Sequence, residues 1–378
     1  MSSLESLWIT FFVSIILVLI SQSRSKYIRD GHGKIKNIFR DKTIFIIATI
    51  IMSFFIGLRI WCNDTGTYRD IYEYLTSATG NVFRGISWKI GDSPGFLVVN
   101  SILKHCGLST QSYLMFYAFI TVGLYMWFIY RHSIDLSMSV FLLWTMGVYT
   151  FAAAGMRQAV AIAIGLIGVD YFLRKKKIGF IFWVFVAVLF HPYTICFLLA
   201  PLMTYSPWKK KTYWMIGICG IIGIFLGRFI DLILNVTNMM GKQYNESDFT
   251  GEGVNIFRLL VVWAPIVLSF LLRKFMKNSN DKRNNLFMNF SILNACIMFV
   301  ALFGTANYFA RLANYFLIFQ TLSVPWIISF FNEKNRKFMK VVIVCCYLLY
   351  FFFANVILTP FNSYFAKMSI WEYLSSIL

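Results

Sequence analysis

The chain has 378 residues, of which 58% are hydrophobic and only 13% are charged, and its formal net charge is +19. Soluble globular proteins are about half apolar and about a quarter charged. This composition therefore leaves too little polar surface for a water-soluble body, and it excludes a soluble enzyme, a disordered protein and a fibrous one. Such a basic balance would suggest nucleic acid as the partner of a soluble protein. In a membrane protein it indicates basic cytoplasmic loops instead, so no nucleic-acid partner is expected.

Apolar stretches follow one another along the whole chain, and a span needs about 20 mostly apolar residues. The sequence predicts an all-α polytopic integral membrane protein with about 12 transmembrane helices, some short or broken, in a single transmembrane domain over residues 1–378. The uninterrupted stretches are Leu4–Ile20, Thr43–Leu58, Gln111–Tyr130, Leu136–Phe151, Met156–Leu173, Tyr213–Ile230, Asn255–Leu272, Leu286–Phe303, Leu312–Phe331 and Met339–Leu358.

One apolar stretch, between Ile178 and Tyr205, is interrupted by the pair His191–Pro192. Proline restricts the residue before it to an extended conformation. We therefore expect two short helices, Ile178–Phe190 and Tyr193–Tyr205, with a turn between them inside the membrane zone near the outer face.

The basic residues predict which loops are cytoplasmic. The first span lacks a basic segment before it and a small-x-small cleavage site after it, so it is not a cleaved signal peptide. The basic run from Arg24 to Lys42 follows that span and places the amino terminus outside. Alternating the loops from there puts most Lys and Arg residues in the cytoplasm, leaves the outer side nearly neutral, and places the carboxyl terminus outside as well.

Three sizeable segments are then expected on the outer side. They are residues 59–110, which contain a stretch typical of an amphipathic interfacial helix, residues 231–254, and the carboxyl-terminal residues 359–378. The cytoplasmic loops are short, so a functional site is expected to open outward.

Arginines at the outer ends of spans are unexpected under the positive-inside rule. An arginine there can extend its side chain to the interface or pair with an acid. Several on one face indicate a pocket for a phosphate or pyrophosphate, because a guanidinium is permanently charged and binds such groups in a bidentate manner. The candidates are Arg59, Arg157, Arg258 and Arg311, and Arg228 lies near another outer span end.

Acidic, histidine and tyrosine residues on the same side complete the candidate site. Asp64 is a candidate base for a hydroxyl, or a cap of a helix over residues 66–75. Asp92, before Pro-Gly-Phe, is a candidate acceptor contact or a cap of the next helix. His191 is a structural residue, a base, or a donor to phosphate or sugar. Tyr68 and Tyr308 are candidates for contact with sugar rings or for the aromatic belt at the interface.

The seven cysteines form no disulfide framework, although Cys62 and Cys106 could pair on the outer side. No CxxC, HExxH or His-rich tract exists, so neither a metal site nor a cofactor is expected. No Walker A sequence exists either, which excludes ATP-driven transport by this chain alone.

Four motifs occur in a fixed order: GLRxxxNDTxxY at 57–68, DSPGF at 92–96, GMRQAVAIAIGLIGVDYFLRKKK at 155–177 and VLFHPY at 188–193. Together with the spans they resemble the EpsG family, which includes Wzy-type polymerases of O-antigen, capsule and exopolysaccharide. The family pattern often has Glu or Asp directly before Pro-Gly-Phe, where this chain has Ser93.

The resemblance implies a metal-independent enzyme of GT-C-like architecture in the bacterial inner (cytoplasmic) membrane, with its active site facing outward. Such polymerases transfer a growing glycan from undecaprenyl pyrophosphate to the non-reducing end of an incoming lipid-linked repeat. The implied partners are undecaprenyl-pyrophosphate-linked oligosaccharides, membrane lipid and a chain-length regulator. An O-antigen ligase is one alternative, and it would be expected to have a larger outer domain. A flippase or transporter is another, and it would need charges within its spans.

The resulting hypothesis gives each residue a role. Arg157 and Arg311 bind pyrophosphate with help from Arg59 and Arg258. Asp64 or His191 acts as the base or orients the acceptor, and Arg157 also takes part in catalysis by stabilising the leaving group. Tyr68, Asp92 and Tyr308 contact sugar or acceptor.

Overall fold

The computed structural model describes residues 2–29, 35–74, 83, 86–241, 245, 248–249 and 253–375. Their packing divides the chain into two units, which are described separately. Unit 1 comprises Met1–Val82, Asn100–Ala163 and Phe351–Leu378, and unit 2 comprises Phe83–Val99 and Ile164–Tyr350. Three helices contribute residues to both units: α4 (Pro94–His105), α8 (Met156–Leu173) and α16 (Glu333–Phe352).

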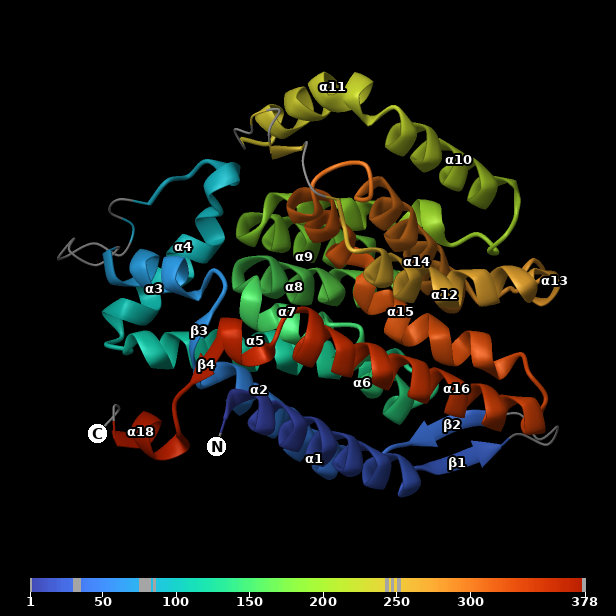
Figure 1. Ribbon diagram of the computed structural model, residues 1–378, viewed down its shortest axis with the longest axis horizontal. Coiled ribbons are helices and arrows are strands. Elements are labelled where there is room, and N and C mark those ends of the chain that lie inside the picture. The colour runs from blue at the N-terminus through green and yellow to red at the C-terminus, as the bar shows by residue number, and fades with distance from the viewer. Residues whose placement is uncertain are drawn as a thin grey trace. The chain divides into compact units, whose positions relative to one another are not determined.

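Unit 1 is built on a set of apolar helices, in which α2 packs between α1 and α5 and α1 also packs on α6 (Figure 1). Polar caps start all four: Ser2 forms a capping box with Glu5 before α1, and Asp41, Ser109 and Asp135 cap α2, α5 and α6. The elements of this unit are α1 (Ser3–Ser23), β1 (Lys26–Arg29), β2 (Ile35–Phe39), α2 (Lys42–Gly57), β3 (Arg59–Cys62), α3 (Thr65–Tyr74), α5 (Thr110–His132), α6 (Leu136–Thr145), α7 (Val148–Ala154), the π-helix η5 (Phe353–Leu358), α17 (Phe361–Tyr364), β4 (Phe365–Lys367) and α18 (Ile370–Ser375).

Two antiparallel strand pairs interrupt this helical unit. Strands β1 and β2 form a hairpin within the predicted first cytoplasmic loop. Strands β3 and β4 pair with Arg59 opposite Lys367 and Cys62 opposite Phe365. The second pair therefore joins parts of two predicted outer segments, residues 59–110 and 359–378.

Unit 2 is centred on α14 and α15, which pack against each other, with α12 contacting both and α10 packing on α14. Asn255 caps α12 and Asp281 caps α14. The elements of this unit are the 3-10 helix η1 (Ile90–Asp92), α9 (Lys177–Phe190), the 3-10 helix η2 (Pro192–Met203), α10 (Lys210–Ile224), α11 (Leu226–Met239), α12 (Ile256–Leu271), α13 (Arg273–Met276), α14 (Lys282–Val300), the π-helix η4 (Ala306–Ala310) and α15 (Arg311–Ser329).

The helices confirm a multi-pass membrane protein. Within the described residues, five helices are long and apolar enough to cross a membrane, or up to seven if each of two bent helix pairs is one span. The pairs are α6 with α7, bent by 47°, and α10 with α11, bent by 101°. Shorter apolar helices, α2, α9, η2 and α12, correspond to further predicted spans.

The structure confirms one predicted break and shows breaks in two spans predicted to be uninterrupted, Leu136–Phe151 (between α6 and α7) and Tyr213–Ile230. The break at His191–Pro192 is present, because α9 ends at Phe190 and η2 begins at Pro192. The continuous span predicted over Tyr213–Ile230 is wrong, since the helix breaks at Phe225, whose φ of −105° and ψ of 28° leave the helical region. Gly220, Gly223 and Gly227 flank this break, and glycine weakens a helix by about 1 kcal/mol relative to alanine.

Candidate functional site

In unit 2 a histidine stands where two apolar helices meet. His191 has an extended backbone (φ −156°, ψ 120°), and its N–H still donates to Ala187 O at the end of α9. Its imidazole Nδ1 lies 2.5 Å from the Tyr315 hydroxyl oxygen, and Tyr315 is fully buried in the first turns of α15. The ring of His191 also contacts the ring of Tyr193, with centroids 5.6 Å apart. The imidazole is therefore held on its Nδ1 side.

Two arginines come to the same end of α15. Arg311 is the first residue of the helix and is exposed, and Asn314 and Tyr315 follow at the i+3 and i+4 positions, which share a helix face with it. Arg258, half-buried on α12, donates from Nη2 to Asn314 Oδ1 at 3.3 Å. Three candidate residues from distant segments of the chain, His191, Arg258 and Arg311, are thus brought to the first turns of one helix.

A π-helix leads into this helix end. The segment Ala306–Ala310 has π geometry, which is rare and often found at functional sites. It carries Tyr308, whose ring packs edge-on against Tyr193 (centroids 6.0 Å apart) and against Phe249 (4.5 Å). We call the residues gathered around this helix end the α15 group: His191, Arg258, Tyr308, Arg311 and Tyr315.

The DSPGF motif packs beside the histidine motif. Ser93 adopts a left-handed conformation with φ 62° just before Pro94 starts α4. A Cβ added to Gly95 would lie 2.8 Å from the Cβ of Leu189, two residues before His191, so only glycine allows this approach. Asp92 is exposed and accepts a hydrogen bond from Ser87 Oγ at 2.6 Å. The expectation that Asp92 caps the following helix is therefore wrong, because its carboxylate is bound to the preceding loop.

In unit 1, Arg59 is a buried cation whose three donor groups all have partners. It is 0% exposed, and it donates from Nε to Thr65 Oγ1 (3.3 Å), from Nη1 to Ile56 O (2.9 Å) and from Nη2 to Met156 Sδ (2.9 Å). Burial lowers the pKa of this guanidinium, an effect that nearby Cys62 partly offsets. Arg59 therefore ties together the end of α2, the start of α3 and the start of α8.

Arg157 differs from Arg59 in its surroundings. It follows Met156 in the first turn of α8 and is half-buried, and within the described part of the chain no hydrogen bond or ion pair engages its guanidinium. Asp64 is half-buried and precedes the first residue of α3, and Tyr68 is 6% exposed on that helix, close enough to interact with Arg59. Arg59, Asp64, Tyr68 and Arg157 are called the α3 group below.

The predicted site residues thus fall into two groups, one in each unit, with Asp92 outside both. Sequence reasoning assigned no specific role to Tyr315, and it missed Asn314 and Met156 as partners. The i+3 and i+4 spacing from Arg311 could have found Asn314 and Tyr315. Cys62 and Cys106 are free thiols, one buried and one exposed, so the expected possibility of a disulfide is not realised.

Comparison with known proteins places the chain in a family. A family model described as the EpsG family matches residues 42–375, which is nearly the whole chain. Neither a curated protein nor a solved structure matches it. The matched region contains all four motifs and both groups of site residues. The chain is therefore a member of the EpsG family, a family of membrane glycan polymerases.

Proposed function

We propose that the protein transfers a growing glycan from undecaprenyl pyrophosphate to the non-reducing end of an incoming lipid-linked repeat, at the outer face of the cytoplasmic membrane. In this step a hydroxyl oxygen of the acceptor attacks the anomeric carbon of the donor. The bond from that carbon to the pyrophosphate oxygen breaks, and the hydroxyl proton passes to a base. Undecaprenyl pyrophosphate leaves with the bonding electrons, so the protein must stabilise anionic charge and accept one proton.

The α15 group is proposed to receive the pyrophosphate of the donor. Arg311 is exposed at the start of α15, and Arg258 is fixed to the same helix by Asn314. Guanidinium groups placed where charge develops lower the transition-state energy without a metal ion. Tyr308, on the π-helix, would offer its ring to the adjoining sugar, since aromatic rings pack well against the apolar faces of sugars.

His191 is proposed to donate a hydrogen bond to the leaving pyrophosphate. A phenol hydroxyl is a better donor than acceptor, so the short contact is assigned as Tyr315 Oη–H donating to Nδ1. In a neutral imidazole the proton then resides on Nε2, because one ring nitrogen donates and the other accepts. Tyr315 is accordingly a positioning residue, which fixes the tautomer of His191.

The α3 group is proposed to receive the acceptor, which is itself a lipid-linked pyrophosphate. Arg157 binds that pyrophosphate, and Asp64 accepts the proton from the attacking hydroxyl. Arg59 has all its donors engaged within the protein, so it positions the turns that carry Asp64 and Arg157. Tyr68, which is buried on α3, is proposed to contribute to the acceptor site. Asp92, in unit 2, is proposed separately as an exposed carboxylate for sugar hydroxyls.

The observation that carries the proposal is the convergence of His191, Arg258 and Arg311 at the start of α15 in a chain of a polymerase family. A ligase would use the same donor but would attach the glycan to a different acceptor. A flippase would move the lipid-linked repeat without forming a glycosidic bond. The product of the reaction therefore distinguishes the three activities.

The test is complementation of a strain that lacks its own polymerase but makes the matching lipid-linked repeat. Arg157→Ala and Arg311→Ala should each abolish the ladder of long glycans and leave single repeats. The matched control is Arg228→Ala, which removes an exposed arginine that packs on Phe225 (5.6 Å from guanidinium carbon to ring centroid). Protein level in the membrane is measured for each variant. Normal ladders from both Arg157→Ala and Arg311→Ala, at normal protein levels, would overturn the assignment.

A further inference from the structure

A second positively charged site lies in unit 2, away from the α15 group in the sequence. It is an open pocket of ≈ 530 Å³ at the start of α10. Four lysines line it: Lys209, Lys210 and Lys211 from the run before and within the first turn of α10, and Lys277 from the segment after α13. None of the residues lining it is acidic.

The aromatic wall of this pocket is firmly built. Asn289, which is fully buried on α14, donates from Nδ2 to the carbonyls of Met203 and Tyr205, both at 2.8 Å. Trp208 is 3% exposed and donates from its indole nitrogen to Ser269 Oγ at 3.2 Å. The turn that carries the three lysines is therefore anchored to two neighbouring helices and does not depend on a ligand for its shape.

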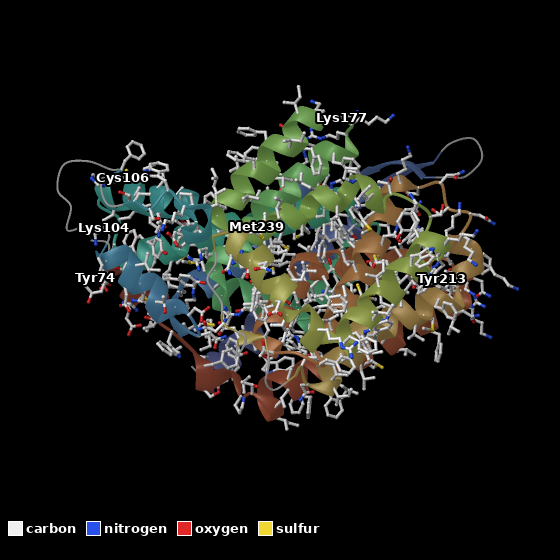
Figure 2. All side chains as sticks on the ribbon, turned by 90° about the horizontal axis from the view of Figure 1, so that it is seen from above. Tyr74, Lys104, Cys106, Lys177, Tyr213 and Met239 are labelled. Carbon is white, nitrogen blue, oxygen red and sulfur yellow. The ribbon has the colours of Figure 1, made fainter. Side chains whose placement is uncertain are left out.

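Two of the lysines are held toward the pocket by aromatic rings. The ammonium of Lys211 lies 5.7 Å from the ring centroid of Tyr205, and that of Lys277 lies 5.9 Å from the ring centroid of Tyr213. Cation–π contacts of this kind stabilise an ammonium without neutralising its charge. Tyr213, which is labelled in Figure 2, thus belongs both to the first turn of α10 and to the pocket wall.

The charge of the four lysines is not neutralised within the protein. Among the described residues no carboxylate forms an ion pair with any of them. Asp281 is the nearest acid in the sequence to Lys277, and it accepts hydrogen bonds from the backbone N–H groups of Arg283 and Asn284 as the cap of α14. The pocket also faces the amino-terminal end of a 15-residue helix, whose dipole adds positive potential.

An apolar surface continues from the lysines along the same helix. Trp214, Ile218 and Ile221 on α10 are 72%, 53% and 55% exposed. A positively charged, aromatic-lined pocket followed by an exposed apolar helix face matches an amphiphile with an anionic head and hydrocarbon tails. A free anion or an acidic peptide would use the lysines but leave the apolar face uncovered.

We propose that this pocket binds the phosphate headgroup of an anionic phospholipid, whose acyl chains lie along α10. Basic pockets between helices at a membrane boundary bind such headgroups, and each lysine near an anionic membrane surface adds attraction that is lost at high salt. The site is separate from the glycan chemistry, and it anchors the α10 end of unit 2 to the lipid surface.

The chain offers its own control in a second run of three lysines, Lys175–Lys177, which ends at the first residue of α9. That run also leads into an apolar helix with exposed residues, Ile178 and Ile181 at 87% and 60% exposed, but none of its lysines lines the pocket. Figure 2 labels Lys177 from this control run. Glutamine replacements of 175–177 and of 209–211 therefore remove equal charge from similar places.

The experiment measures lipid retained by the purified full-length protein in native mass spectrometry, after addition of phosphatidylglycerol or phosphatidylcholine. The wild type and the 175–177 variant should retain phosphatidylglycerol in preference to phosphatidylcholine. In the 209–211 variant, the ratio of retained phosphatidylglycerol to retained phosphatidylcholine should fall by at least about tenfold. Arginine replacements at 209–211 keep the charge and should keep the preference, which separates loss of charge from misfolding.

Two results would overturn the proposal. One is equal phosphatidylglycerol retention by the 209–211 glutamine variant and the wild type. The other comes from equilibrium dialysis with inorganic phosphate: saturable binding that the 209–211 variant loses, without any lipid preference in the wild type, would assign the pocket to a soluble anion instead.

Discussion

Replacing Tyr315 by phenylalanine tests the role assigned to His191 at the level of one oxygen atom. The phenyl ring keeps the packing of a fully buried side chain, including its edge contact with Phe197 at 6.5 Å between centroids. What is lost is the hydroxyl that lies 2.5 Å from His191 Nδ1. The imidazole is then free to hold its proton on either nitrogen.

The expected loss of transfer activity in Tyr315→Phe follows from the cost of an unsatisfied buried polar group, about 1–3 kcal/mol. If that interaction supports the transition state, the same energy corresponds to a transfer rate about 5- to 150-fold lower. The fold itself should lose about 0.6 kcal/mol, the average for side-chain hydrogen bonds within a membrane protein, and at most about 1.7 kcal/mol. The activation barrier should therefore rise by as much as, or more than, the folded state is destabilised.

The assay uses purified protein and a synthetic undecaprenyl-pyrophosphate-linked repeat, and it follows release of undecaprenyl pyrophosphate with time. The matched control is Tyr347→Phe, which removes another buried tyrosine hydrogen bond, from Tyr347 Oη to Val261 O at 2.9 Å, without touching His191. Tyr347→Phe should keep near-normal activity at a similar loss of stability. Equal transfer rates in Tyr315→Phe and the wild type, or equal losses in both variants, would refute the positioning role of Tyr315.

Three further predictions concern other residues. Arg59→Ala should lower the free energy of unfolding by about 1–3 kcal/mol, measured by denaturant titration in detergent, because the buried acceptors Thr65 Oγ1, Ile56 O and Met156 Sδ lose their charged donor. A midpoint equal to that of the wild type would contradict its structural role. Gly165→Ala should destabilise the folded protein by about 1–3 kcal/mol, since the added Cβ would lie 2.4 Å from Phe197 Cδ2. Its control is Gly217→Ala, whose added Cβ would have no atom within 4 Å, and which should be neutral or slightly stabilising in the same titration. Burial raises the pKa of the Cys62 thiol to about 12, so near pH 8 it remains a neutral, unreactive thiol, and this preference for the neutral form is lost only as the pH rises through that value. A membrane-impermeant maleimide added to cells should label exposed Cys106 and spare Cys62 when labelled peptides are mapped by mass spectrometry; labelling of Cys106 only after lysis would contradict the outward orientation of residues 59–110.

The sequence predicted the helices well where polar residues mark their ends. The predicted span Met156–Leu173 coincides with α8, and the His191–Pro192 break was correctly placed because proline leaves few alternatives to a break. The bend at Phe225 was missed, since an apolar run with scattered glycines has the same hydropathy whether it is straight or bent by 101°. Strand β3 was missed because its partner, β4, lies about 300 residues away, and local patterns carry no information on such pairing.

The candidate site shows the same division between local and long-range information. Charge at outer span ends was sufficient to select Arg258 and Arg311, but both Arg59 and Arg157 match that criterion equally well. Only the three-dimensional contacts distinguish the two arginines. The donors of Arg59 bind Thr65, Ile56 and Met156, whereas Arg157 is the residue that follows Met156 on α8. Likewise, the contact of His191 with Tyr315 joins residues 124 positions apart, which no local motif contains.

The π-helix before α15 indicates how this helix end could have arisen. A π turn corresponds to one extra residue inserted into an α-helix, and each residue of an α-helix advances the chain by about 100° around its axis. The insertion at Ala306–Ala310 therefore resets the rotational phase between Tyr308 and Arg311, while leaving Arg311, Asn314 and Tyr315 in register with one another. A single-residue insertion or deletion here would rotate Tyr308 by about 100° around the helix axis relative to Arg311, without altering any side chain. The number of residues in this segment, and not only their identity, therefore specifies how its side chains are arranged.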